Sequence, residues 1–453
     1  MKFRIINSLL IAFACLTAFG CGPLDRTGKP LVYGYPQAEY HKAGSILMYT
    51  PGAELFDGVI HPDAGLYERY FDIDKAADEH RNYISMLEEE GCSVHTVTNT
   101  LLSMPHGRLV SLAQTSLTYD VSNLEISEQE VQALYKQQVL ASMSNSDLVR
   151  IIINRPTVIL KKSGINTGFE AQYLHNPLMN MYFLRDQSIT TPNGHIMCRM
   201  NSSQRAPEVD IIEACYEQLG EPAIYQVKGE DSHLEGGDYI PFGTISLIGQ
   251  GLRTNQKAID ELLENNCFGH DTVVVVRERW KDQYQMHLDT YFNVIDKDLC
   301  TMCFNRYDAR DMSDINYLTM DMYVRAPGQT AYRLDEGYSG KGFREFLESR
   351  GVKIIRISKE DADHYANNFL TIDARHIMSV AGQSKALEAE YAKYGVRVEW
   401  VPLDNLIGGY GAAHCMTQVL NRGRQTTDRG DMTNFLNKAF GSLQARTKSG
   451  QSL

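Results

Sequence analysis

The sequence has no excess of basic residues. Its 44 lysine and arginine residues are outnumbered by 56 aspartate and glutamate residues, and the formal net charge of −12 repels phosphate backbones. This balance argues against nucleic-acid binding. With 22% charged and 43% hydrophobic residues, the composition is that of an ordinary globular protein, which argues against wholesale disorder and against a multispanning membrane protein.

The motifs of several common cofactor and metal sites are also missing. Cys300 and Cys303 have CxxC spacing, but the chain has no second CxxC and no paired histidine spacing, which disfavours a zinc site. No G-x-G-x-x-G turn opens a helix after a strand, which disfavours a dinucleotide-binding doubly wound fold. The glycine-rich stretch before Cys415 lacks the Lys and Ser/Thr that hold phosphate and magnesium in a P-loop.

The N-terminus has the pattern of an export signal. Lys2 and Arg4 precede an apolar run that is too short to span a bilayer, which predicts a signal peptide over residues 1–20. The small residues before Cys21 resemble a bacterial lipoprotein cleavage box, so Cys21 is the candidate lipidation site and the one expected means of membrane attachment. A simple secretory signal, or a buried first helix in a cytoplasmic protein, is the alternative. Residues 21–39 are predicted to form a tether, and the protein is expected in the cell envelope or periplasm.

One supersecondary unit recurs five times: an amphipathic helix that stops near a glycine and continues as a β-branched strand. A glycine at the end of a helix adopts the left-handed conformation without steric cost. The units cover residues 76–97, 211–227, 258–276, 343–357 and 387–401, and their glycines are Gly91, Gly220, Gly269, Gly351 and Gly395. Since each helix needs a sheet to cover its apolar face, the pattern predicts a single α/β domain.

The regions outside these units differ in character. The 453 residues could form about three average domains, but the five units favour one domain over residues 40–425. Between the first two units, residues 111–168 are predicted to be a helical insertion, with Ser127 and Glu130 as a capping box. Residues 426–453 read as a polar C-terminal tail with one short helix.

Polar residues interrupt apolar sequence in three segments, each at the same place relative to its unit. These are Leu234–Asp238, Met286–Asp289 and Gly408–Thr417. If the units are related by pseudo-rotation, the segments converge at one end of the domain, where a cysteine, a histidine and several carboxylates would suit thiolate nucleophilic catalysis. Taken singly, each has a plainer interpretation: a satisfied core histidine, a turn, or an inert buried thiol.

Several motifs together resemble the arginine deiminases, in the guanidino-group-modifying superfamily. They are Tyr49–Glu54, Phe71–Asp72, Glu79–His80, Asn176–Asp186, Leu234–Asp238, Gly249–Thr254, Met286–Thr290 and Gly408–Gln418, in family order over about residues 44–425. In Tyr49–Glu54 the His-Arg pair of the family is replaced. The resemblance implies a five-bladed pseudo-symmetric α/β propeller of ββαβ units, with a helical insertion after the first unit.

The same resemblance assigns catalytic roles. Asp186 and Asp289 would bind the guanidinium group, whose planar N–H donors match carboxylates. Cys415 would attack the guanidinium carbon, and His287 would protonate the leaving ammonia and then activate water. Glu235 would orient His287. This chemistry needs neither a metal nor an organic cofactor.

Substrate binding is assigned in the same way. Asn180, Arg205 and Arg253 lie at the family positions that bind the α-carboxylate of arginine, and Gly409 and Gly411 complete the substrate-binding set.

The leading hypothesis is therefore hydrolysis of L-arginine to citrulline and ammonia, with a small guanidine as the partner and a homo-oligomer as the expected assembly. Some arginine deiminases carry an arginine where this chain has Tyr410. Agmatine or a peptidyl arginine therefore stays open as a substrate. Two competing hypotheses are an amidinotransferase and a non-catalytic guanidine-binding protein.

Overall fold

The computed structural model describes residues 31–165, 167–326 and 328–425, and its main body contains five sheets with one topology. In each, two strands pair antiparallel and a third lies parallel to the middle one. The sheets are β23 (Gln418–Val419), β3 (Ser45–Met48) and β4 (Ser93–Thr96); β8 (Ser188–Thr191), β9 (Gly194–Met197) and β10 (Tyr225–Gln226); β11 (Tyr239–Phe242), β12 (Ile245–Gln250) and β13 (Thr272–Arg277); β14 (Phe292–Asp296), β15 (Leu299–Cys303) and β19 (Lys353–Ile357); and β20 (Leu370–Asp373), β21 (His376–Val380) and β22 (Arg397–Val401). No sheet within the described ranges closes on itself.

A helix connects the second and third strands of each sheet, so the predicted helix–glycine–strand units are confirmed. The helices are α4 (Ile73–Glu89), α9 (Ala206–Leu219), α10 (Gln256–Glu264), α13 (Phe343–Ser349) and α15 (Lys385–Lys393). All five glycines named above have φ between 66° and 82°. Substitution there would strain the backbone, because other residues rarely adopt positive φ.

Further elements extend the fourth unit and surround the first. The chain after β15 forms α12 (Phe304–Asp308), β16 (Thr319–Val324), β17 (Arg333–Leu334) and β18 (Lys341–Gly342), and α14 (Lys359–Asp363) follows β19. Strand β16 pairs with β13 and so enlarges the third sheet. Three short helices flank the first unit: α2 (Leu55–Val59), α3 (Pro62–Gly65) and α5 (Val97–Leu102).

The two ends of the described chain meet in one small sheet. Strand β1 (Leu31–Gly34) and strand β2 (Lys42–Ala43) both pair antiparallel with β24 (Arg422–Gln425). The structure therefore differs from the predicted tether over residues 21–39, since the chain from Leu31 onward is part of the fold. The predictions for residues 1–20, Cys21 and the tail 426–453 lie outside the described residues.

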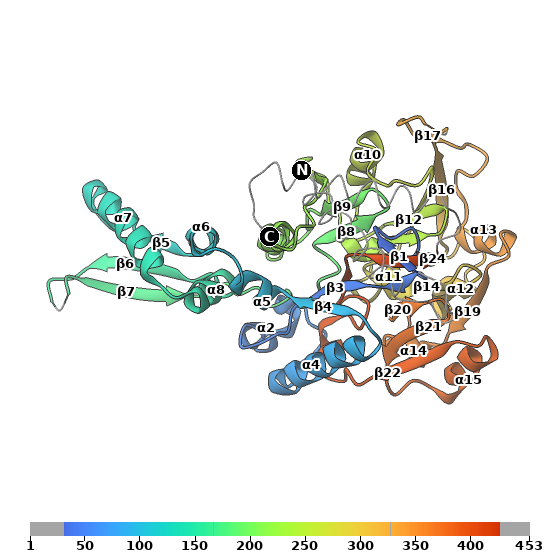
Figure 1. Ribbon diagram of the computed structural model, residues 1–453, viewed down its shortest axis with the longest axis horizontal. Coiled ribbons are helices and arrows are strands. Elements are labelled where there is room, and N and C mark those ends of the chain that lie inside the picture. Colours follow the sequence, from blue (N-terminus) through green and yellow to red (C-terminus); the bar gives the residue numbers. More distant parts are fainter. Residues whose placement is uncertain (1–30, 166, 327, 426–453) are drawn as a thin grey trace, which may run out of the picture.

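The insertion projects away from the five sheets, at the left of Figure 1. It contains three helices, in agreement with the predicted helical character, but also a three-stranded sheet that the sequence reading missed. Its elements are α6 (His106–Ser116), β5 (Thr118–Asp120), α7 (Ile126–Ser142), α8 (Asn145–Asn154), β6 (Thr157–Lys162) and β7 (Phe169–Leu174). Helix α7 begins after Glu125, so Ser127 lies within the helix and does not cap it.

Apolar side chains of the strands and helices form the core. In β13 the run from Val273 to Val276 is fully buried, as expected for a strand covered on both faces. No helix in the described part of the chain is long and apolar enough to span a membrane.

Candidate active site

The predicted catalytic residues lie in segments that immediately precede the first strands of four of the five sheets. Asp186 precedes β8, and the short helix η2 (Gly236–Asp238), next to Glu235, precedes β11. The helix α11 (Leu288–Tyr291) follows His287, carries Asp289 and leads into β14. Cys415 lies between the short helix η4 (Leu406–Gly409) and β23.

Hydrogen bonds join these segments into a ring. The links are Arg185 N to Cys415 O (3.0 Å), Gly236 N to Asp186 O (3.0 Å), Leu288 N to Asp238 Oδ1 (2.9 Å), Asn368 Nδ2 to Asp289 O (3.2 Å) and His414 N to Asn368 O (3.0 Å). Each of the five sheets contributes one segment, so the ring fixes the relative positions of groups far apart in the sequence.

A close approach of backbones in this ring requires glycine. A Cβ added to Gly236 would lie 1.9 Å from the carbonyl oxygen of Arg185, and one added to Gly237 would lie 2.6 Å from Nδ1 of His287. The first contact is with backbone, which cannot rotate away. Gly236 therefore allows the close approach to the segment of Arg185, and Gly237 makes room for the ring of His287.

The five predicted catalytic residues are all buried and lie together. Nε2 of His287 is 2.9 Å from Glu235 Oε2, and its Nδ1 is 3.6 Å from Asp186 Oδ1. Sγ of Cys415 is 3.5 Å from Asp289 Oδ2. The structure thus brings the thiol, the imidazole and three carboxylates into one site.

One pocket is lined by three of these five residues and by most of the predicted binding residues. Its lining includes Asn180, Arg205, Arg253 and Gly409, together with Asp186, His287, Cys415 and Tyr410. Gly411 packs directly behind the nucleophile, because a Cβ there would lie 3.0 Å from Cβ of Cys415.

The polar groups of the predicted binding residues are partly engaged by the protein itself. Arg205 donates to Asp186 Oδ2 at 2.6 Å and to Glu208 Oε2 at 2.9 Å, so it holds the carboxylate of Asp186 in place. Arg253 donates to Gln283 Oε1 at 2.9 Å, and its buried Nε has no partner among the described residues. Nδ2 of Asn180 donates to the carbonyl of Gly65.

The carboxylates keep His287 protonated. Burial by itself would lower the pKa of His287, but the charges of Asp186, Asp238 and Glu235, with the hydrogen bond to Glu235, raise the pKa to about 9. Burial would conversely raise the pKa of Glu235, yet the contact with His287 and the charge of Arg253 lower it to about 2. At neutral pH the pair is an imidazolium next to a carboxylate.

The carboxylate charges of the site also raise the pKa of the Cys415 thiol. Burial raises the pKa of Cys415 well above its usual value, and the carboxylates of Asp289 and Asp186 raise it further. A hydrogen bond from Asn368 lowers the pKa of this thiol. Without a bound cation the site therefore favours the thiol over the thiolate.

Asn368 is a residue of the site that the sequence reading missed. Its Oδ1 accepts from the backbone N–H groups of Ala412 (2.8 Å) and Cys415 (3.1 Å), and its Nδ2 donates to Sγ of Cys415 at 3.0 Å. It lies two residues before β20, as Asp186 lies two residues before β8. The repeat offered a signal for this residue. The segment before β20 held no predicted site residue, whereas the corresponding segments of the other four units did, so a site residue was to be expected there.

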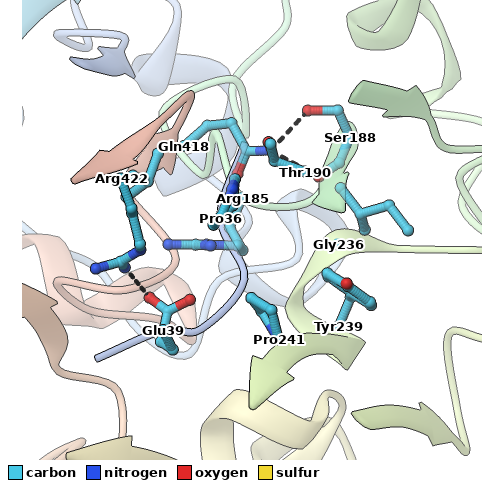
Figure 2. Close-up of a pocket in the computed structure, with 12 residues that line it drawn as sticks. Pro36, Glu39, Arg185, Ser188, Thr190, Gly236, Tyr239, Pro241, Gln418 and Arg422 are labelled. Carbon is cyan, nitrogen blue, oxygen red and sulfur yellow. Dashed lines mark hydrogen bonds and ion pairs between the residues drawn. The ribbon is translucent and has the colours of Figure 1, made fainter. Parts of the chain in front are cut away.

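A buried chain of charges leads away from the pocket. Asp289 Oδ2 is 2.6 Å from Nδ1 of His414, whose Nε2 is 3.5 Å from Glu39 Oε1. Glu39 in turn pairs with Arg422 beside a second cavity, which Figure 2 shows together with Arg185. Burial would raise the pKa of Asp289, but its contact with His414 lowers it.

Two groups of side chains have donor atoms close enough to hold a metal ion. Asp186, Glu235 and His287 form the first, and Glu90, His376 and Glu399 the second. In the first, the proton retained by His287 competes with a metal for the imidazole nitrogen. In the second, Arg397 already bridges both glutamates at 2.6 Å.

The fold and the site define a hydrolase that acts on the C–N bonds of a linear amidine, in the guanidino-group-modifying superfamily. The family model for arginine deiminase matches residues 64–422, and the chain belongs to that family. The chain is 26% identical to the arginine deiminase of Halobacterium salinarum (85% of this chain, 96% of that protein). It is 25% identical to the arginine deiminase of Treponema denticola (85% and 97%).

A solved structure supports the fold. The N-terminal domain of ArgZ, an arginine dihydrolase from cyanobacteria, matches with a TM-score of 0.50 at 16% identity, over 83% of this chain and 97% of that chain.

Adjacent asparagines allow a matched test of the role of Asn368. We predict that Asn368→Ala lowers kcat about 10- to 100-fold, the value of one hydrogen bond to a charged sulfur. The control is Asn367→Ala, because Asn367 is equally buried but donates to Cys303 instead. Steady-state kinetics of guanidine hydrolysis and thermal melting of both variants provide the measurement. Equal kcat values for the two variants would contradict the role.

Proposed function

We propose that the protein hydrolyses L-arginine to L-citrulline and ammonia through a covalent intermediate on Cys415. One observation carries the proposal. Asp186 and Asp289 each have a buried Oδ1 atom with no hydrogen-bond partner among the described residues, and Oδ2 of Asp289 lies 3.5 Å from Sγ of Cys415. Buried carboxylate oxygens without partners are costly, and the N–H groups of a planar guanidinium would satisfy both at once.

Binding of such a cation also activates the nucleophile. The carboxylates of Asp289 and Asp186 raise the pKa of Cys415, so a guanidinium that neutralises them favours loss of the thiol proton to solvent. The thiolate then attacks the central carbon of the guanidinium. His287, protonated at neutral pH, donates a proton to the departing nitrogen, which leaves as ammonia.

The second half of the reaction regenerates the enzyme. After ammonia leaves, His287 is neutral and accepts a proton from water, whose oxygen attacks the carbon of the thiouronium intermediate. The carbon–sulfur bond then breaks, and the hydroxyl proton of the adduct passes to the departing sulfur. The ureido group of citrulline and the thiol of Cys415 remain. Glu235, 2.9 Å from His287, stabilises the imidazolium in both proton transfers.

The residues that would bind the α-carboxylate of the substrate favour arginine, but they leave a second candidate substrate. Arg253 and Asn180 line the pocket, and Arg253 would pair with an α-carboxylate. Arg205 is already engaged by Asp186 and Glu208, and Tyr410 takes the place of an arginine found in some relatives. A guanidine without a carboxylate, such as agmatine, is therefore the alternative substrate. Transfer of the amidino group to an acceptor amine in place of water would be an alternative reaction.

We further propose a propeller arrangement of the sheets and export of the protein. The five sheets of equal topology, each giving one segment to the ring, support their arrangement as blades of a five-bladed propeller. The pattern of residues 1–21 supports export to the cell envelope or periplasm, with lipidation at Cys21.

Removal of the nucleophile separates binding from chemistry. We predict that Cys415→Ala abolishes citrulline release while arginine binding stays measurable by calorimetry, since Asp186 and Asp289 remain. The control is Cys303→Ala, a buried thiol that lines a different pocket. Unchanged turnover in Cys415→Ala would overturn the mechanism.

The pH profile should report His287. Its folded pKa of about 9 lies above the ordinary 6.5, so the required proton is present below pH 9 and is lost as the pH rises through it. We predict that kcat/KM falls above about pH 9. Because the contact with Glu235 raises the pKa, Glu235→Gln should move this limb to lower pH, which titration of the substrate amine would not do. A descending limb near pH 6.5 in the unaltered enzyme would contradict the prediction.

The role of Arg253 can be tested by comparing two substrates. We predict that Arg253→Ala raises KM for arginine at least about tenfold more than KM for agmatine, which lacks the carboxylate. Steady-state kinetics on both guanidines provide the measurement, and Arg199→Ala, a change outside the pocket lining, is the control. Equal effects on the two substrates would remove Arg253 from carboxylate binding.

A further inference from the structure

A separate cavity, which we call the outer cavity, lies against the wall of the catalytic pocket. Its volume is about 540 Å³, which is the size of a site for a small molecule. Residues 282–287 contribute to both spaces. Gln283 and His287 line the catalytic pocket, whereas Tyr284 and Gln285 line the outer cavity. This segment is therefore a wall that the two spaces share.

An aromatic contact crosses this wall. The ring of Tyr284 packs edge-on against the ring of Tyr410, with 5.2 Å between the centroids, and Tyr410 lines the catalytic pocket. The hydroxyl of Tyr284 donates to Glu68 Oε1 at 3.0 Å, and the backbone N–H of Glu68 donates to the carbonyl of Gly408 at 2.7 Å. The outer cavity therefore adjoins the segment that carries the nucleophile.

Carboxylates outnumber bases in the outer cavity. Glu68, Asp282 and Asp363 line it, and Lys359 is the single base among its described lining residues. Lys359 already pairs with Asp363 at 2.5 Å. No lysine or arginine in the described ranges forms an ion pair with Glu68 or Asp282. The cavity thus holds two carboxylates whose charges are not balanced by a neighbouring base.

The tyrosines around Glu68 respond to its charge. Glu68 accepts hydrogen bonds from the hydroxyls of Tyr284 and Tyr365, at 3.0 and 2.8 Å. Burial, the hydrogen bond to Glu68 and the charge of Glu68 raise the pKa of Tyr284 to about 12. Burial and the charge of Glu68 likewise raise the pKa of Tyr365. Two hydroxyl donors satisfy the oxygens of the carboxylate but leave its charge, which attracts a cation.

Aromatic rings form another part of the lining. Trp280 is 40% exposed, Tyr284 is 45% exposed, and Phe304 lies with them in the cavity. Arg306 already lies over the Trp280 ring, 5.5 Å from its centroid, and Glu278 balances the charge of this arginine at 2.9 Å. Aromatic rings next to carboxylates bind cations that also have an apolar part.

We propose that the outer cavity is a second binding site, for an organic cation that combines an ammonium or guanidinium group with an apolar stem. The carboxylates of Glu68 and Asp282 pair with the charge, and the rings of Trp280 and Tyr284 cover the stem. This site does not depend on hydrolysis at Cys415, although it lies next to the pocket where a guanidine would react.

Trp280 makes the site observable, because the chain has two tryptophans and the other is Trp400. A full-length chain with Trp400→Phe and Cys415→Ala fluoresces from Trp280 alone and does not consume a guanidine. We expect a saturable change in this fluorescence with n-butylguanidinium. The neutral isostere n-butylurea has the same shape without the charge, and should bind at least about tenfold more weakly.

A matched pair of substitutions tests the charge. Asp282→Asn keeps an acceptor for the N–H of Tyr284, which lies 2.9 Å from Asp282 Oδ1, and should raise the dissociation constant of n-butylguanidinium at least about threefold. Asp120→Asn is the control, since Asp120 accepts in the same way from the N–H of Ser122 at 3.1 Å, on the insertion. Far-UV circular dichroism shows that each variant is folded.

Asp289→Asn, added to the same chain, separates the two spaces. It removes a carboxylate of the catalytic site and should leave the Trp280 titration unchanged. A signal that disappears in this variant would place the ligand in the catalytic pocket and overturn the proposal. So would the absence of a saturable change, equal affinities for the cation and the urea, or equal effects of Asp282→Asn and Asp120→Asn. A failure of arginine hydrolysis in the unaltered chain would overturn the proposed function and leave this site standing.

Discussion

The active site depends on the ring of hydrogen bonds that joins the segments before the five first strands. Each link pairs a buried donor with a buried acceptor from the next segment, for example Gly236 N with Asp186 O and His414 N with Asn368 O. A buried polar group left without a partner costs free energy, so breaking any one of these hydrogen bonds would destabilise the folded protein. The ring thereby fixes the thiol, the imidazole and the carboxylates relative to one another, although they come from segments distant in the sequence.

The charges inside this ring explain why the site needs a cationic substrate. Asp186 and Asp289 are held as acceptors by Arg205 and His414, yet each keeps one oxygen without a hydrogen-bond partner among the described residues. Their charge keeps His287 protonated and raises the pKa of Cys415. The arrangement that prepares the acid thus suppresses the nucleophile. In the proposed mechanism, a guanidinium that binds between the carboxylates removes that suppression, so that substrate binding itself activates the thiol.

The repeat made much of the fold predictable. The helix–glycine–strand units were located from spacing and glycines, because an amphipathic helix and a left-handed glycine are local properties. The sheet in the insertion was missed, because β6 pairs with β7 on one side and, across sequence that reads as helical, with β5 on the other. The chain from Leu31 to Gly34 was read as a tether, since its partner strand lies at the other end of the sequence.

The sequence by itself determined the five units and supplied, with the family resemblance, the residues Cys415, His287, Glu235, Asp186 and Asp289. Only the tertiary structure showed that Asn368 contacts the thiol of Cys415 and that Arg205 donates a hydrogen bond to Asp186. The reason is physical. Residue type and periodicity follow from neighbours along the chain, whereas the partner of a buried polar atom is chosen by which sheet segments the fold places within hydrogen-bond distance.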